Sequence, residues 1–184
     1  MGICRVQSGI TIACGDLSFP GGVFPDFYVG YVRDLSTPIS TTQAAAVSTL
    51  AFVAYRGLVK FEGQKYSHKA DWEWQKGGGG NGFFLQRFTA KLTSLSTQDD
   101  VEIQRLLQAQ DAFIIWRDNN DAFRISGAKN GLASIAGAVG SSGMAQGDEI
   151  LDTITLEGAE ATKPIRFDVG TVATTLSYLE ARIV

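Results

Sequence analysis

The amino-acid sequence predicts a mainly β fold: a β-sandwich or β-barrel with one flanking α-helix and a long β-hairpin. Apolar and polar residues alternate along Phe83–Leu95 and Ile150–Glu157, as they do on half-buried strands. Aromatic and β-branched residues, which favour strands, crowd Asp26–Val32. The 21 glycines against 4 prolines indicate many turns. A length of 184 residues with 45% hydrophobic residues suits a single domain over residues 1–184.

The first third of the chain is expected to alternate strands with irregular segments. Ile10–Ala13 can form a short strand, and the Pro-Gly-Gly run at residues 20–22 indicates a turn. Ser, Thr, Ala and Gln dominate Leu35–Ser48, which we expect to be a surface loop, with a weak helix across Gln43–Val47 as the alternative. A β pattern resumes over Leu50–Phe61.

Lys65–Leu95 is predicted to form one long hairpin. Its tip is the run Gly77–Gly82, which is too rich in glycine to continue either strand. Trp72 and Trp74 are two residues apart, so they lie on one face of the first strand. The returning strand has a face made of Phe84, Gln86, Phe88, Ala90 and Leu92.

A helix of about three turns is expected to follow the hairpin and to end near Gln110. Ser96 or Thr97 can cap its N-terminus, and Asp99 and Asp100 place negative charge where the helix dipole favours it. The apolar stripe that would cover a sheet or barrel end consists of Ile103, Leu106 and Leu107.

The remaining chain is expected to return to strands and loops. Ala112–Trp116 and Ala122–Ser126 are predicted strands, joined by the turn residues Asp118-Asn119-Asn120-Asp121. Ala128–Gly147 is a loop of small residues. Three further strands are then predicted: Ile150–Glu157, ended by Gly158, then Ile165–Val169 and Thr174–Ile183.

Charge and hydropathy limit the classes of function. The net charge is −3 and the sequence pI is about 5.1, with no basic run, which argues against a protein that grips nucleic-acid phosphates. No apolar run approaches the roughly 20 residues that span a bilayer, and the N-terminus lacks a signal-peptide core, so we expect the chain to be made and kept in a cytoplasm without a membrane anchor. Cys4 and Cys14 are accordingly expected to be reduced thiols.

The sequence offers only poor matches to known catalytic, cofactor-binding or metal-binding motifs. Gly77, Gly79 and Gly82 match a G-x-G-x-x-G pattern, but a dinucleotide site needs a helix directly after it, whereas a strand is predicted here. His68 is the only histidine and is expected to face solvent, and its spacing from the two cysteines does not suit zinc. The acidic pair at residues 99–100 is explained by helix capping, and the turn at 118–121 lacks the pattern of a calcium loop. We therefore expect no catalytic residue, cofactor or metal.

Four aromatic residues, Trp72, Trp74, Phe83 and Phe84, lie on both arms of the predicted hairpin. The favoured interpretation is that they belong to the hydrophobic core. The alternative is that the hairpin projects from the body and presents them to a neighbouring subunit, since aromatic residues are enriched at interfaces.

A family resemblance rests on the order and spacing of short motifs along most of the chain. These are Cys14-Gly15-Asp16, Gly21-Gly22, Phe27-Tyr28-Val29-Gly30, the helix Gln98–Gln110, Ile114-Ile115-Trp116-Arg117-Asp118-Asn119, Gly131-Leu132, Ser142-Gly143, Gly147-Asp148 and Ile154-Thr155-Leu156-Glu157-Gly158. In this order the chain resembles the tail tube (major tail) proteins and related virion proteins of tailed bacteriophages, notably those infecting Bacteroidetes.

The resemblance implies a non-enzymatic structural protein of the virion tail, made in the host cytoplasm. Copies would assemble into rings, usually hexameric, that stack into a hollow tube through which DNA passes as non-specific cargo. Other tail proteins, such as a tape measure or a sheath, would be partners, and an acidic lumen would offer DNA few phosphate contacts. The residues expected at subunit contacts are Trp72, Trp74, Gly79, Asn81, Phe83, Phe84, Thr41, Gln43, Ile135, Val139 and Met144.

Several alternatives stay open. A tail terminator, head-tail connector or baseplate-hub ring protein would share the fold, as would the inner tube of a bacterial injection device. From another class, the chain could be a monomeric β-barrel binding module, or a small hydrolase that uses the acidic residues of the turn at 118–121.

Overall fold

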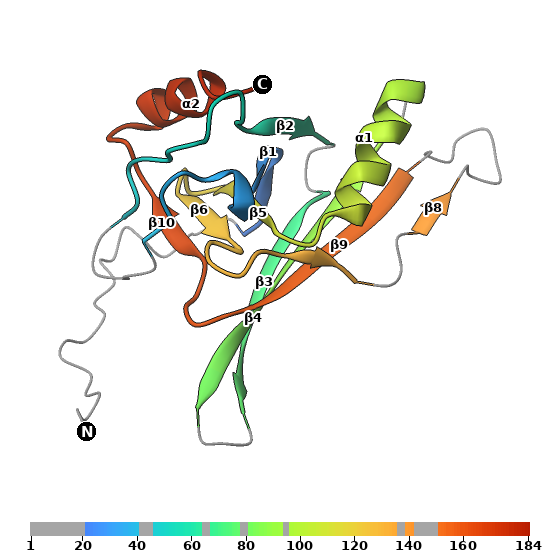
Figure 1. Ribbon diagram of the computed structural model, residues 1–184. Helices are drawn as coiled ribbons and strands as arrows, with labels where there is room; N and C mark the ends of the chain where they lie inside the picture. Colours follow the sequence, from blue (N-terminus) through green and yellow to red (C-terminus); the bar gives the residue numbers. More distant parts are fainter. Residues whose placement is uncertain are drawn as a thin grey trace, which may run out of the picture.

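The computed structural model describes residues 21–40, 46–63, 67–77, 81–93, 96–135, 139–141 and 151–184 (Figure 1). The elements in chain order are β1 (Val23–Tyr31), the short 3-10 helix Val32–Asp34, β2 (Val59–Glu62), β3 (Lys69–Lys76), β4 (Gly82–Leu92), α1 (Thr97–Gln108), β5 (Ala112–Asp118), β6 (Phe123–Ser126), β7 (Ala133–Ser134), β8 (Val139–Ser141), β9 (Leu151–Glu160), β10 (Ile165–Phe167) and α2 (Val172–Glu180). The predicted strand at Ile10–Ala13, both cysteines and residues 142–150 lie outside the described residues.

The strands form two antiparallel sheets, so the mainly β prediction is confirmed. Sheet 1 has the order β10-β6-β5-β1-β2. Sheet 2 has the order β3-β4-β9-β7, and β8 also pairs with β9. The described strands do not close into a barrel. The β-sandwich alternative is thus closer to the observed architecture than the barrel.

Sheet 1 is buried on both faces, and its central strand β5 explains the continuous apolar run in the sequence. Ala112, Ile114 and Trp116 point to one hydrophobic cluster. Phe113 and Ile115 point to a second cluster on the opposite face. A strand covered on both sides has no polar face to alternate with, so its sequence reads as uninterrupted hydrophobic residues.

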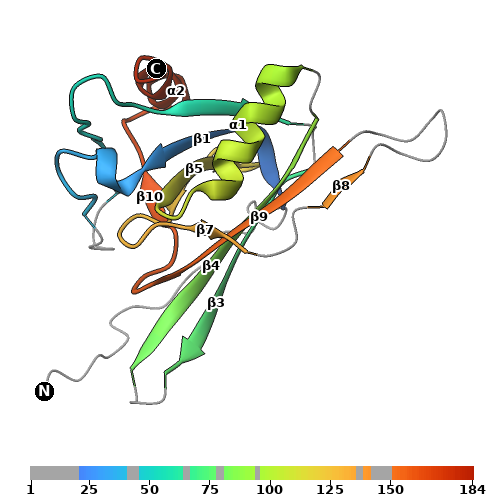
Figure 2. The ribbon, with the colours of Figure 1, turned by 45° about the vertical axis from the view of Figure 1, so that its right-hand side comes forward.

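The first cluster lies between the two sheets, with α1 against it (Figure 2). Its buried members from both sheets and α1 include Phe27, Val29, Phe88, Leu92, Ile103, Leu106, Trp116, Ile154 and Leu156. Helix α1 confirms the predicted helix: Ser96 is the N-cap, and its hydroxyl accepts a hydrogen bond of 3.2 Å from the Asp99 backbone N–H. The helix ends at Gln108, two residues before the expected end, because Ala109 adopts extended backbone angles.

The second cluster is covered by α2 and by the segment that precedes β2. The prediction of a strand at Thr174–Ile183 is wrong, since Val172–Glu180 is a helix, so the described residues contain two α-helices rather than the single one expected. Thr171 caps this helix in a reciprocal arrangement with Thr174, and Leu179 is fully buried. Threonine and valine favour strands, but the cap and the i, i+4 spacing of the buried Thr175 and Leu179 outweigh that propensity here.

Other boundaries differ from the prediction. Of the expected strand Leu50–Phe61, only the last three residues belong to a strand, β2 (Val59–Glu62). The described parts of Leu35–Ser48 are irregular, as expected for a loop. The small-residue segment expected to be a loop contributes β7 and β8 to sheet 2. Strand β9 continues through Gly158, which was expected to end it. A Cβ at Gly158 would lie 2.3 Å from the Gly131 carbonyl oxygen, so the glycine permits close backbone approach rather than a turn.

Candidate subunit interface

The predicted hairpin is confirmed as β3 and β4, which pair antiparallel from Lys69 opposite Thr89 to Lys76 opposite Gly82. The Gly77 backbone N–H donates to the Asn81 carbonyl oxygen at 2.7 Å, which closes the described part of the tip. Beyond the pair Ala70 and Phe88, the hairpin extends past sheet 1 as an arm, at first beside β9 as far as the pair Phe84 and Glu160 and then alone (Figures 1 and 2). We call residues 71–77 and 81–87 the hairpin arm.

The arm exposes its tryptophans. Trp72 is 40% exposed and Trp74 is 55% exposed, so the interpretation of these two residues as core is wrong. They lie on the face that is continuous with the core, because Trp72 is opposite Gln86 and Trp74 is opposite Phe84. Nearer the body, residues on this face are covered by sheet 1. The arm overhangs the body, and its apolar face therefore meets solvent.

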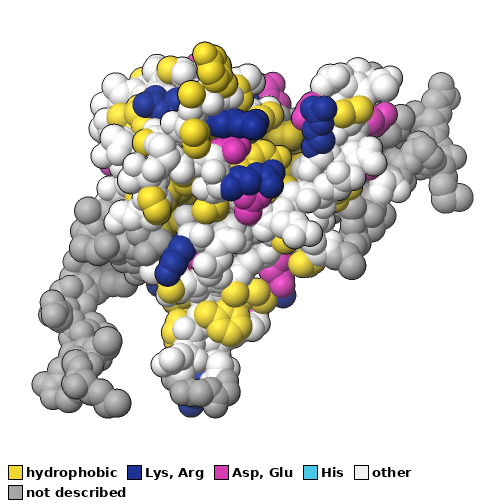
Figure 3. Space-filling model, in the orientation of Figure 1, with side chains coloured by type: hydrophobic (Ala, Val, Ile, Leu, Met, Phe, Trp, Pro, Cys, Tyr) yellow, Lys and Arg dark blue, Asp and Glu magenta, His cyan; other side chains and the backbone are white. Residues whose placement is uncertain are grey.

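Packing within the arm holds Trp74 in place. Its ring lies 4.8 Å from the Phe84 ring, measured between centroids. The indole also lies across Gly82, where an added Cβ would come within 1.9 Å of it. A side chain on Gly82 would displace the indole, so the last glycine of the tip allows the tryptophan to lie flat on the opposite strand. Figure 3 shows hydrophobic side chains gathered on this arm.

Trp72 lies at the mouth of a groove between the arm and the end of sheet 1. The groove has a volume of about 350 Å³. The Arg124 guanidinium lies 5.8 Å from the centre of the Trp72 ring, within the range of a cation–π contact. Other lining residues include His68, Trp116 and Asp118. The groove thus combines an aromatic wall with charges of both signs.

His68, at the root of the arm, is buried. It was expected to face solvent, but only 5% of its surface is exposed, so that prediction is wrong. Its Nε2 lies 2.9 Å from the Pro25 carbonyl oxygen, and the Lys91 backbone N–H lies 3.4 Å from its Nδ1. Burial lowers the pKa of the imidazole, although the Pro25 carbonyl and the Asp26 charge act in the opposite direction.

Strand β3 is an edge strand in the described part of sheet 2, since β4 is its only neighbour there. An edge strand presents a row of backbone N–H and C=O groups that can pair with another chain. The edge is eight residues long and carries both exposed tryptophans. Charged side chains, which natural proteins use to discourage unwanted pairing, also line it at Lys69, Asp71 and Lys76.

The structure divides the predicted interface residues between two edges of sheet 2. Trp72, Trp74, Asn81, Phe83 and Phe84 lie together on the hairpin. Ile135, 38% exposed, and Val139 lie at the opposite edge, where the Ile135 backbone N–H donates to Thr155 and Val139 pairs with Thr153. The remaining four residues of the prediction, Thr41, Gln43, Gly79 and Met144, lie outside the described residues.

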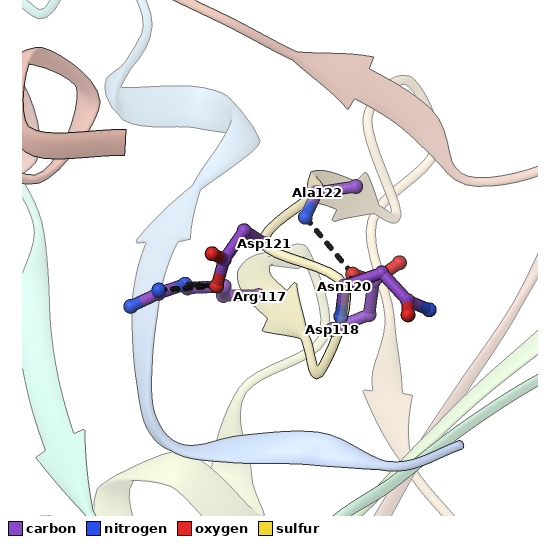
Figure 4. Close-up of polar contacts among 5 residues, drawn as sticks. All are labelled: Arg117, Asp118, Asn120, Asp121 and Ala122. Atoms are coloured by element: carbon purple, nitrogen blue, oxygen red, sulfur yellow. Dashed lines mark hydrogen bonds and ion pairs between the residues drawn. The ribbon is translucent and has the colours of Figure 1, made fainter. Parts of the chain in front are cut away.

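The acidic turn between β5 and β6 is stabilised by its own carboxylates (Figure 4). Asp118 Oδ1 accepts hydrogen bonds of 2.9 Å from the backbone N–H groups of Asn120 and Ala122. Asp121 has a left-handed backbone with φ of 64°, and its carboxylate accepts a hydrogen bond of 3.0 Å from Arg117 Nε. These contacts support the prediction of a turn, because both carboxylates already have partners that fix the loop.

One exposed feature was missed in the sequence. Tyr55 is 98% exposed and has a left-handed backbone with φ of 61°, in the segment between the 3-10 helix and β2. Val53, Ile183 and Val184 are also exposed, and Leu58 forms a bridge with Ile183 that brings the two segments together. Periodicity over Leu50–Phe61 pointed to a strand, and a lone exposed tyrosine leaves no periodic signal.

Comparisons with other proteins leave the family open. No family model matches the chain, and searches of curated proteins and of solved structures returned no match. Among the described residues, no group of three or more His, Cys, Asp or Glu side chains is arranged to hold a metal ion. Neither described helix is long and apolar enough to span a membrane.

Proposed function

We propose that this chain is a structural subunit of a phage tail tube, in which copies join into stacked rings around a lumen that conducts DNA. The observation that supports this proposal most strongly is the hairpin arm, which exposes both Trp72 and Trp74 and packs Trp74 against Phe84. Large aromatic side chains at interfaces supply much of the binding free energy when a partner buries them. A monomer gains little from holding two tryptophans in solvent on a projecting arm.

The two edges of sheet 2 also support assembly from copies of the same chain. Strand β3 lies at one edge, while β7 and β8 lie at the other. Backbone pairing between the first edge of one copy and the second edge of the next would extend the sheet without a new fold. Such head-to-tail contacts close into rings when the rotation between neighbours allows it.

The face of sheet 2 that points away from the core suits a lumen wall. Two ion pairs lie on it: Arg87 binds Glu157 on the neighbouring strand, and Lys69 Nζ lies 2.7 Å from Asp71. Glu73 and Lys91 add one further charge of each sign to this face. Thr89 and Thr155 lie side by side, with their hydroxyl oxygens 3.2 Å apart. Cations that are already paired bind phosphates weakly, so this face would let DNA pass without strong contacts. The expected acidic lumen is replaced in this proposal by a charge-balanced one.

The proposal is tested by the assembly state of the purified protein. We expect negative-stain and cryo-electron microscopy of concentrated protein to show rings or tubes with one ring symmetry. Replacing both tryptophans by serine should abolish these particles, because the arm then loses its apolar contact area. A variant with phenylalanine at both positions keeps aromatic side chains and should retain at least part of the assembly.

Two results would contradict the proposal. The first is a wild-type chain that stays monomeric at millimolar concentration and is missing from purified virions. The second is unchanged assembly in the double serine variant, which would remove the arm from the interface. Copy number in virions separates a tube from a terminator, connector or baseplate-hub ring, because a tube needs many rings and the others need one or two. A tape measure or sheath would be sought by cross-linking in the same virions.

A further inference from the structure

The root of the hairpin arm is held by one side chain that bridges the two sheets. His68 directly precedes β3, and its Nε2 lies 2.9 Å from the carbonyl oxygen of Pro25 in sheet 1. Its Nδ1 lies 3.4 Å from the backbone nitrogen of Lys91 in sheet 2. A single imidazole therefore links β1, β4 and the start of β3.

The hydrogen-bond partners of the imidazole define which of its two nitrogens carries the proton. The Pro25 carbonyl can only accept a hydrogen bond, so Nε2 carries the hydrogen and donates it. The Lys91 backbone N–H can only donate, so Nδ1 must offer a lone pair. Both contacts are satisfied only by the neutral imidazole in this tautomer. A second proton, on Nδ1, would turn an acceptor into a donor that faces the Lys91 N–H, and the Ser67 hydroxyl, 3.4 Å from Nδ1, would then have to act as the acceptor.

The surroundings of the ring are mostly apolar. The Phe27 ring lies edge-on with its centroid 5.1 Å away, and the Phe88 ring lies at 6.2 Å. Gly63 closes over the imidazole, since a Cβ there would come within 2.3 Å of Cε1. The charged residues on the surrounding strands carry both signs: Asp26 on β1, Lys60 and Glu62 on β2, Lys69 and Asp71 on β3, Lys91 on β4, and Asp118 and Arg124 across the groove.

We propose that His68 is an acid-sensitive latch: its neutral ring holds the arm root against sheet 1, and protonation of Nδ1 releases it. Protonation breaks the contact with Lys91 and leaves a cation between Phe27 and Phe88. The latch is a property of the single subunit. Its effect on assembly, in which acid would loosen contacts made by the arm, rests on the function proposed above.

The sign of the pH dependence follows from burial. The pKa of His68 is lowered in the folded protein, whereas an unfolded histidine titrates near 6.5. The unfolded chain therefore takes up the proton first as the pH falls. The stabilising contribution is complete above about pH 6.5 and is lost between that value and the lower pKa of the folded state. As the pH falls through this window, the equilibrium constant for unfolding rises by up to about tenfold for each pH unit.

Because His68 is the only histidine, its proton NMR signals titrate without ambiguity in dilute protein. We expect a midpoint below 6.5. Hydrogen exchange, corrected for intrinsic rates, should show that peptides covering residues 67–71 and 85–93 lose protection between pH 7 and pH 5, while peptides from β5 keep theirs. A midpoint at or above 6.5, or uniform loss of protection, would overturn the latch.

The matched control is His68→Gln, whose amide can donate and accept as the neutral imidazole does but does not titrate. Urea unfolding of both proteins at pH 7 and pH 5 should show that the wild type loses more stability than the variant. Equal losses would contradict the proposal. If the variant does not fold, the wild-type titration and exchange data decide. These measurements need no rings or tubes, so failure of the latch is distinguishable from failure of the assembly proposal.

Discussion

Aromatic residues have different roles in the two sheets. Sheet 1 is covered on both faces, by sheet 2 with α1 on one side and by α2 with its neighbouring segment on the other. Sheet 2 is covered on one face only, and its first two strands continue past the core as the hairpin arm. Most aromatic side chains in sheet 1 are buried and the others are half-buried, whereas Trp72 and Trp74 in sheet 2 are exposed. The comparison separates a region that stabilises the fold from one that is available for contacts.

The largest expected effect is a difference in stability between two variants, each of which lacks one phenylalanine side chain, in sheet 1 or in sheet 2. Phe27 in β1 is fully buried and packs against Phe61, Phe88 and His68. Phe27→Ala should lower the free energy of unfolding by about 3–5 kcal/mol, because it leaves a cavity. Phe83→Ala, on the outer face of sheet 2, should cost less than about 1 kcal/mol. Urea denaturation of both variants checks this, and similar losses would break the comparison.

A smaller effect is expected from the helix that covers the second face of sheet 1. The Thr171 hydroxyl accepts a hydrogen bond of 3.2 Å from the Thr174 backbone N–H and caps α2. Thr171→Ala should lower the unfolding free energy by about 1 kcal/mol. Thr171→Ser keeps the hydroxyl and serves as the control. If thermal denaturation gave both variants the wild-type midpoint, α2 would not contribute to the stability of sheet 1.

The smallest expected effect concerns a buried hydroxyl group in sheet 1. The Tyr28 hydroxyl is buried and has no hydrogen-bond partner among the described residues, and burial raises the pKa of this phenol. Tyr28→Phe should leave stability unchanged or raise it by up to about 1 kcal/mol, because a buried unpaired hydroxyl is costly. Chemical denaturation at pH 7 measures the change. A clear loss of stability would show that the hydroxyl has a partner in solution.

The sequence predicted best where local chemistry decides the structure. The hairpin follows from alternation on either side of a glycine run, and α1 follows from the Ser96 cap and its apolar stripe. The turn at Asp118–Asp121 follows from side chains that bond their own backbone. Each of these elements is specified by residues that are neighbours in the chain, so a single sequence is sufficient to find it.

Prediction from the sequence failed where contacts between residues far apart in the chain determine the structure. Most of the strand predicted at Thr174–Ile183 is part of helix α2, whose Tyr178 hydroxyl accepts a hydrogen bond from the backbone N–H of Leu50, 128 residues away. Burial of His68 depends on Pro25 and Lys91, which are 43 and 23 residues away. The exposure of Trp72 and Trp74 depends on how far the arm extends beyond sheet 1, which no local pattern records.

The two edges of sheet 2 are unlike each other, and this has a consequence for symmetry. One edge is a long aromatic strand, while the other consists of two short strands. A contact that joins the first edge of one copy to the second edge of another cannot be two-fold symmetric. A ring closed in this way uses both edges of every copy and has no two-fold axis across its plane, so its two faces are chemically different. Different proteins can therefore bind the two faces.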